Sequence, residues 1–154
     1  MKKIIDLSFI FIVIAILLSV VLIVVSCNST TVDEIMPANI EGIHFQKGNI
    51  KLALEQSKAQ NKPVCIFAYG NHCGYCKKMK KEVFPEKIVA ETFNNNFINV
   101  QVDVDSDEGK NITDQFHIAA TPTFIFMNSN GQVFKQLSGF QDKEELLAAT
   151  KTIQ

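Results

Sequence analysis

Apolar residues are concentrated at the amino terminus of the chain. Residues 7–25 contain no charged side chain, and Lys2 and Lys3 stand before them. As a helix this segment would reach about 28 Å, close to the hydrocarbon thickness of a bilayer. Acidic residues precede the next lysine, Lys47, so the positive-inside rule places the remainder outside the cytoplasm. We therefore predict a signal or anchor segment at residues 1–26 and an oxidising environment for the rest of the chain.

Two forms of this segment remain open. Its apolar core is longer than the roughly 7 to 15 residues of an ordinary signal peptide, which favours an uncleaved transmembrane helix. Val24-Val25-Ser26-Cys27 is similar to the bacterial lipoprotein box, in which Cys27 would receive the lipid. The alternative for Cys27 is a free thiol at the membrane surface. Either form tethers the protein, and the polar residues 27–40, which lack periodicity, are predicted to be a linker.

Residues 41–154 alternate between helical and strand periodicity. Helices are predicted at 48–60, from 73 onward with a bend or restart at Pro85, around 112–116, and at 143–153. Strands are predicted at 64–69, 97–104, 123–127 and 132–137, with a turn at 128–131 between the last two. This order predicts a single α/β domain, in which a mixed central sheet is flanked by helices.

The predicted strand at 64–69 shows little alternation, because both of its faces are apolar. Val64 and Ile66 point one way, whereas Cys65 and Phe67 point the other. This pattern is typical of a central parallel strand that is buried on both faces. Cys65 is then an inert core thiol, with a third redox role as the alternative. In the helix that follows, Met79 and Val83 face inward, and the lysines, Lys80 among them, are expected to be solvated.

Composition narrows the range of functions. The chain has 154 residues, 15 Lys+Arg against 16 Asp+Glu, and 47% hydrophobic residues. These values exclude a disordered chain and a strongly basic nucleic-acid-binding protein. Every basic residue is lysine, so the guanidinium group that reads phosphate or guanine with two parallel bonds is missing. Four cysteines are too few to staple so long a chain, which must depend on a hydrophobic core.

The motif with candidate chemistry is Cys73-Gly74-Tyr75-Cys76, which stands between the predicted strand and a lysine-rich helix. Two cysteines at this spacing on the first turn of a helix can close a disulfide, and the helix amino end favours a thiolate on the first sulfur. We therefore expect Cys73 to be the nucleophile. Cys76, one turn further in and shielded, is expected to be the resolving thiol.

Other uses of the pair are weaker. A zinc site needs a second pair of ligands, but the remaining candidates occur singly: Cys27, Cys65, His44, His72 and His117. A c-type haem site needs histidine after the second cysteine, where Lys77 stands. A purely structural disulfide would close too short a loop to remove much unfolded-state entropy. We therefore expect redox chemistry without a metal or an organic cofactor.

From about residue 43 to 153 the chain resembles the thioredoxin superfamily, especially bacterial domains similar to the carboxy-terminal domain of the periplasmic thiol:disulfide interchange reductase. The motifs that carry the resemblance are Lys62-Pro63-Val64, Cys73-Gly74-Tyr75-Cys76-Lys77-Lys78-Met79, Val102-Asp103-Val104-Asp105 and Ala120-Thr121-Pro122-Thr123. The resemblance implies a thioredoxin-like fold and a cis Thr121-Pro122 bond beside the cysteines. It also implies that the backbone of Thr121, with Pro122 and Tyr75 nearby, contacts an extended substrate.

Three positions qualify the resemblance. The dipeptide Gly74-Tyr75 matches the periplasmic disulfide isomerase, but the linker leaves no room for that family's dimerisation domain. Phe67 stands where thioredoxins carry a buried aspartate that helps to deprotonate the resolving thiol, so water or another group must take that proton. His72 replaces the usual tryptophan before the first cysteine. As a cation it would lower the pKa of the Cys73 thiol, and the alternative is an exposed histidine without a role.

The sequence as a whole predicts a membrane-tethered, extracytoplasmic thiol-disulfide oxidoreductase. Disulfide reduction is the favoured activity, and the direction of electron flow stays open. Its expected partners are extracytoplasmic proteins with disulfides or thiols and a membrane electron donor, with no nucleic acid. We expect a monomer. The alternatives are a thioredoxin-like binding or chaperone module that keeps the cysteines as a clasp, and a reductase dedicated to cytochrome c or metal-site maturation.

Overall fold

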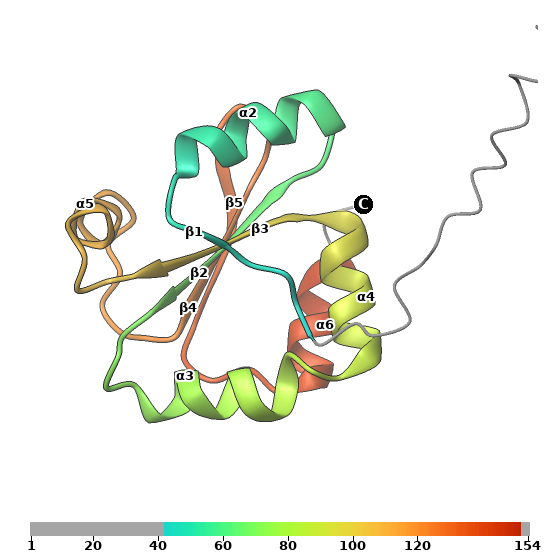
Figure 1. The fold of residues 1–154 in the computed structure, drawn as a ribbon, viewed down its shortest axis with the longest axis vertical. Helices are drawn as coiled ribbons and strands as arrows, with labels where there is room; N and C mark the ends of the chain where they lie inside the picture. The colour runs from blue at the N-terminus through green and yellow to red at the C-terminus, as the bar shows by residue number, and fades with distance from the viewer. Residues whose placement is uncertain (1–41, 152–154) are drawn as a thin grey trace, which may run out of the picture. The chain divides into compact units, whose positions relative to one another are not determined.

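The computed structural model describes residues 42–151, which form a five-stranded sheet of order β1-β3-β2-β4-β5 with helices on both faces (Figure 1). The elements are β1 (Gln46–Lys47), α2 (Ile50–Gln60), β2 (Val64–Tyr69), α3 (Gly74–Lys78), the π-helical turn η1 (Met79–Val83), α4 (Lys87–Asn96), β3 (Ile98–Asp103), α5 (Asp107–Gln115), β4 (Thr123–Met127), β5 (Val133–Ser138) and α6 (Lys143–Lys151). This is the predicted mixed α/β sheet between helices.

Strand β2 lies at the centre of the sheet. It pairs parallel with β3 and antiparallel with β4. Its two faces enter two separate hydrophobic cores, as the apolar run predicted. Cys65 and Phe67 pack with residues of α3, η1, α4 and α6, whereas Val64 and Ile66 pack with residues of α2 and α5. The same separation is visible in Figure 1, where α2 and α5 lie on the opposite side of the sheet from α3, α4 and α6.

Two observed elements differ from the predicted ones. Strand β1 is only two residues long and both are exposed, so it has no periodicity to detect. Helix α5 begins at Asp107, well before the predicted residue 112, because the Ser106 hydroxyl accepts the N–H of Gly109 at 3.0 Å and caps the helix. The restart at Pro85 is confirmed, since α4 begins at Lys87.

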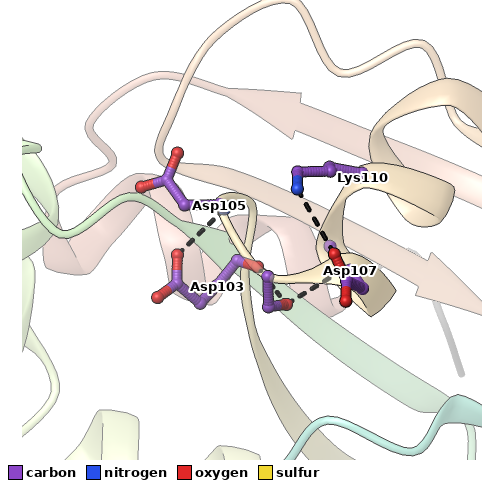
Figure 2. A network of polar contacts seen from close by, with 6 residues as sticks. Asp103, Asp105, Asp107 and Lys110 are labelled. Atoms are coloured by element: carbon purple, nitrogen blue, oxygen red, sulfur yellow. Dashed lines mark hydrogen bonds and ion pairs between the residues drawn. The ribbon is translucent and has the colours of Figure 1, made fainter.

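The turn from β3 into α5 is held by short-range polar contacts (Figure 2). One carboxylate oxygen of Asp103 accepts the N–H of Asp105 at 3.0 Å, and the Ser106 hydroxyl donates to the Asp103 carbonyl at 2.6 Å. Lys110 pairs with Asp107 at 3.3 Å. In this turn Gly109 lies against the backbone at the end of β3, where a β-carbon would lie 2.7 Å from the carbonyl carbon of Asp103.

The predicted membrane segment at residues 1–26, the linker at 27–40 and the start of the domain at residue 41 lie outside the described residues and stay predictions. Within residues 42–151, no helix has both the length and the apolar character needed to cross a bilayer.

Replacing Gly109 by alanine is expected to lower the free energy of unfolding by about 1–3 kcal/mol, because the new methyl group would overlap the backbone of Asp103 and Val104. Urea unfolding followed by circular dichroism measures the change. The matched control is Gly74→Ala, where a β-carbon meets no atom within 4 Å. Equal midpoints for Gly109→Ala and the unmodified chain would show that the turn after β3 adapts without cost.

Candidate active site

The two cysteines of the motif form a disulfide in this structure. The sulfurs of Cys73 and Cys76 are 2.09 Å apart, with a Cα–Cα distance of 5.2 Å. Their exposure differs, since Cys73 is half-buried whereas Cys76 is 1% exposed. A protein thiol or disulfide arriving from solvent therefore meets Cys73 first. This geometry suits the predicted roles of nucleophile and resolving thiol, which stay predictions.

The local backbone explains this difference in exposure. After β2 ends, the N–H of Cys73 donates to the Gly70 carbonyl at 3.2 Å, which closes a tight turn. Cys73 then precedes α3 and its sulfur accepts the N–H of Cys76 at 3.0 Å, as a helix-capping side chain does. The donor favours negative charge on the Cys73 sulfur. Cys76, inside the first turn, points into the core with Met79.

The Thr121-Pro122 peptide bond is cis, as the resemblance implied. Gly70 shows how near this bond lies to the motif: a β-carbon at Gly70 would contact the Thr121 hydroxyl at 3.5 Å and the Cys73 β-carbon at 3.9 Å. Within residues 42–151, neither the N–H nor the carbonyl of Thr121 has a hydrogen-bond partner. An extended peptide beside Cys73 therefore meets free backbone groups with which it can pair.

An aromatic and cationic surface lies beside the exposed cysteine. Tyr75 is 62% exposed, and its ring centroid is 5.9 Å from that of Phe140. The Lys78 amine lies 4.7 Å from the centroid of the Phe140 ring. Sequence analysis did not identify Phe140, which follows β5 far from the motif along the chain. The N–H of the preceding Gly139 donates to the Pro122 carbonyl at 2.7 Å, and this hydrogen bond holds Phe140 near the cis peptide bond.

Phe67 stands in the core where thioredoxins carry a buried aspartate. Phe67 is fully buried and contacts Phe84 and Phe124 at centroid distances of 5.0 and 5.1 Å. The Lys80 amine lies 3.6 Å from the centroid of the Tyr69 ring and 5.7 Å from that of Phe67. Burial lowers the pKa of Lys80, and the nearby Asp103 carboxylate opposes this effect. The Lys80 side chain is exposed, as the helical pattern predicted, and its amine also lies over the Tyr69 ring.

The remaining candidates have simpler surroundings. Cys65 is fully buried in β2, and burial raises the pKa of its thiol far above the usual range, as expected for an inert core thiol. His72 is exposed in the turn before Cys73, and its tuning role stays a prediction. Among residues 42–151, no three His, Cys, Asp or Glu side chains are grouped closely enough to hold a metal ion. Cys27 lies outside the described residues.

Comparison with known proteins finds thiol-disulfide proteins among the relatives of this chain. The family model described as a thioredoxin-like domain matches residues 50–154. The thiol:disulfide interchange protein DsbD of Yersinia pestis is 27% identical over 113 residues, which cover 70% of this chain and 19% of that protein. The chain thus spans about a fifth of the length of this DsbD relative. Thioredoxin-1 of Drosophila yakuba is 29% identical over 87 residues, covering 56% of this chain and 73% of that protein.

Solved structures share the same fold. A putative disulphide-isomerase from Bacteroides thetaiotaomicron has a TM-score of 0.67 at 33% identity, covering 74% of this chain and 94% of that chain. The oxidised carboxy-terminal domain of DsbD from Neisseria meningitidis has a TM-score of 0.60 at 19% identity, covering 68% and 93% respectively. The second likeness concerns the fold alone.

Proposed function

The chain belongs to the thioredoxin-like domain family, and from this premise we propose that its Cys73–Cys76 pair reduces protein disulfides outside the cytoplasm from a membrane tether. The domain is a thiol-disulfide oxidoreductase; the proposal concerns its direction, its location and the roles of its residues. The observation that carries the proposal is the unequal exposure of the two sulfurs beside the unpaired backbone of Thr121.

The reduced pair would act in two steps. The Cys73 thiolate attacks a substrate disulfide, so that a mixed disulfide forms and the first substrate sulfur leaves with the electron pair. Cys76 then loses its proton and attacks the Cys73 sulfur. The bond between Cys73 and the substrate breaks, the second substrate sulfur leaves as a thiolate that takes up a proton, and the Cys73–Cys76 disulfide closes. The substrate is reduced by two electrons, and the pair is oxidised by two.

The surroundings of the pair suit a protein substrate. An extended segment can hydrogen-bond the backbone of Thr121 and lie across the exposed Tyr75 ring and Phe140. Each turnover leaves the pair oxidised, so a dithiol donor must return two electrons and two protons. In an oxidising compartment this donor is proposed to be a membrane reductase, which receives its electrons from the cytoplasmic side.

Cys73→Ser is expected to reduce disulfide turnover to the uncatalysed level, because the attacking sulfur is lost. Cys76→Ser is expected to accumulate mixed disulfides with extracytoplasmic proteins in intact cells, because the resolving thiol is lost. Non-reducing electrophoresis with mass spectrometry of the adducts measures both outcomes. Cys65→Ala is the matched control, since this thiol is fully buried and its removal leaves exchange intact.

Full turnover by Cys73→Ser, or a Cys76→Ser variant without adducts, would contradict the assigned roles. Cellular function retained by the double variant Cys73→Ser/Cys76→Ser would instead identify a binding module.

The reduction potential of the pair tests its direction. For a reductase we expect a value near that of thioredoxin, about −270 mV, because the disulfide must then be the stable form after each turnover. Equilibration of the full-length chain with dithiothreitol or glutathione buffers, followed by alkylation of free thiols, gives the potential. A value between about −120 and −180 mV would identify an oxidant or isomerase and refute the proposed direction.

The tether is tested by the intact mass of the protein extracted from the membrane fraction. An uncleaved helix is expected to give the mass of the complete 17.2 kDa chain. A lipoprotein is expected to begin at Cys27, with a smaller polypeptide mass and an added lipid. Recovery of the protein from the soluble fraction without residues 1–26 and without lipid would refute the membrane tether.

A further inference from the structure

The resolving thiol lies in surroundings that oppose its ionisation. Cys76 is 1% exposed and belongs to the buried cluster that contains Phe67 and Met79. Burial disfavours a thiolate, as the raised pKa of the buried Cys65 thiol shows. The resolving step nevertheless requires a thiolate at Cys76. Since Phe67 provides no charged or proton-accepting atom, another group must offset the cost of ionising Cys76.

Lys80 is placed on the correct side of the helix. It follows Cys76 by four positions in the continuous run of α3 and η1, and residues four apart lie on one helix face. At η1 the N–H of Phe84 donates to the Met79 carbonyl at 2.9 Å, which is the wider spacing of a π-helical turn. The Lys80 side chain lies on the rings of Tyr69 and Phe67, the latter a member of the same buried cluster as Cys76.

The acidic groups among residues 42–151 form no ion pair with the Lys80 amine, which can therefore interact with a thiolate. Asp103, opposite Tyr69 in the β2–β3 register, is the acid whose charge acts on it. That carboxylate is engaged elsewhere, because it accepts from the Asn71 amide at 2.7 Å and from the Asp105 N–H at 3.0 Å. No ion pair joins Lys80 to an acid within residues 42–151. The charged neighbours on its own helix are Lys77, Lys78, Lys81 and Glu82, all of them exposed.

A pocket connects this lysine to solvent. It is lined by Lys80 together with Gly42, Ile43, Phe45, Phe84, Pro85 and Gln101. Lys80 is the one titratable side chain in that lining. The lining is of mixed polarity, and a cation held beside the protein interacts more strongly with a nearby thiolate than a cation in bulk water does. Water in the pocket can also receive a proton that leaves the interior.

We propose that Lys80 is a positioning residue for the resolving step, in which its ammonium group stabilises the Cys76 thiolate while water in the adjoining pocket takes the proton. This proposal rests on the proposed function, since it concerns the second of the two exchange steps. The Cys76 sulfur loses its proton to water and forms the bond with Cys73. The bond between Cys73 and the substrate breaks, and its electron pair leaves on the substrate sulfur.

The test is the pKa of the Cys76 thiol in the reduced, full-length chain in detergent micelles, with Cys73→Ser present so that Cys76 is the one thiol of the motif that titrates. The Cβ carbon shift of Cys76, followed by nuclear magnetic resonance, reports it directly. Lys80→Met is expected to raise this pKa by about one unit, which means roughly tenfold less thiolate at neutral pH. Lys80→Arg retains the cation and is expected to keep the value within a few tenths of a unit.

Lys81→Met is the matched control, because Lys81 is the next lysine on the same helix, is exposed as Lys80 is, and has no ring contact among the described residues. Its removal is expected to change the Cys76 pKa by less than a few tenths of a unit. An unchanged pKa in Lys80→Met, or an equal change in Lys81→Met, would overturn the proposal. Lys80→Gln and the backbone amide spectrum separate a charge effect from a packing effect.

The kinetic consequence is a pH profile. With Cys73 restored, Lys80→Met is expected to slow the release of substrate from the mixed disulfide about tenfold at neutral pH, and the deficit should disappear above the Cys76 pKa. A deficit that is equal at every pH would indicate a structural role and refute the proposal. The titration does not require turnover, so failure of the exchange mechanism and failure of the Lys80 assignment give different results.

Discussion

Strand β2 is hydrogen-bonded on both edges, to β3 and to β4, and its side chains are buried on both faces of the sheet. The strand therefore has little freedom to shift or rotate, because a slip of one residue would exchange the contents of the two cores. The turn at Gly70 and the start of α3 follow directly from its end. Every other feature of the site is positioned relative to this fixed point.

The cis Thr121-Pro122 bond reaches the motif through the same strand. It precedes β4, which pairs with β2 from Val64 to Ala68. The antiparallel register sets the start of β4 beside the end of β2. Thr121, whose backbone is unpaired within residues 42–151, and the half-buried sulfur of Cys73 therefore lie at the same end of these two strands. Phe140 follows the last residue of β5, and the hydrogen bond from the Gly139 N–H to the Pro122 carbonyl holds this segment beside the motif. Three segments that are distant along the chain thus form one surface.

The interior below the cysteines is an apolar core, and the Lys80 amine approaches its rim. Phe67 enlarges the aromatic cluster with Phe84 and Phe124, and Cys76 is 1% exposed in the same buried cluster. Burial raises the cost of a thiolate, so the proposed ionisation of the second sulfur depends on charges at the rim of the core. Lys80 reaches that rim across Tyr69, and Asp103 at the end of β3 sets the local field in which it lies.

The sequence by itself determined the elements that depend on local patterns. The bounds of β2 and β4 follow from uninterrupted apolar runs, the start of α6 follows from its amphipathic spacing, and the cysteine pair follows from its place between strand and helix. Features that depend on distant contacts required the tertiary structure. The two-residue β1 exists only because it pairs with Val100 and Gln101. The start of α2 combines a local cap, in which the Asn49 side chain accepts the N–H of Leu52 at 2.9 Å, with a distant contact, in which Glu108 of α5 accepts the N–H of Asn49 at 2.8 Å.

The same distinction applies within the site. The residue types of Cys73, Cys76 and the Thr121-Pro122 motif are sufficient to identify them, because their chemistry or their backbone constraint is unusual. Phe140 and Lys80 are ordinary residues in their local sequence; helical periodicity correctly assigns Lys80 to solvent but does not reveal its contact with the Tyr69 ring. Their positions were decided by the packing of α3 and η1 over β2 and by the return of β5 to Pro122. Such contacts join residues far apart along the chain, which no local pattern records.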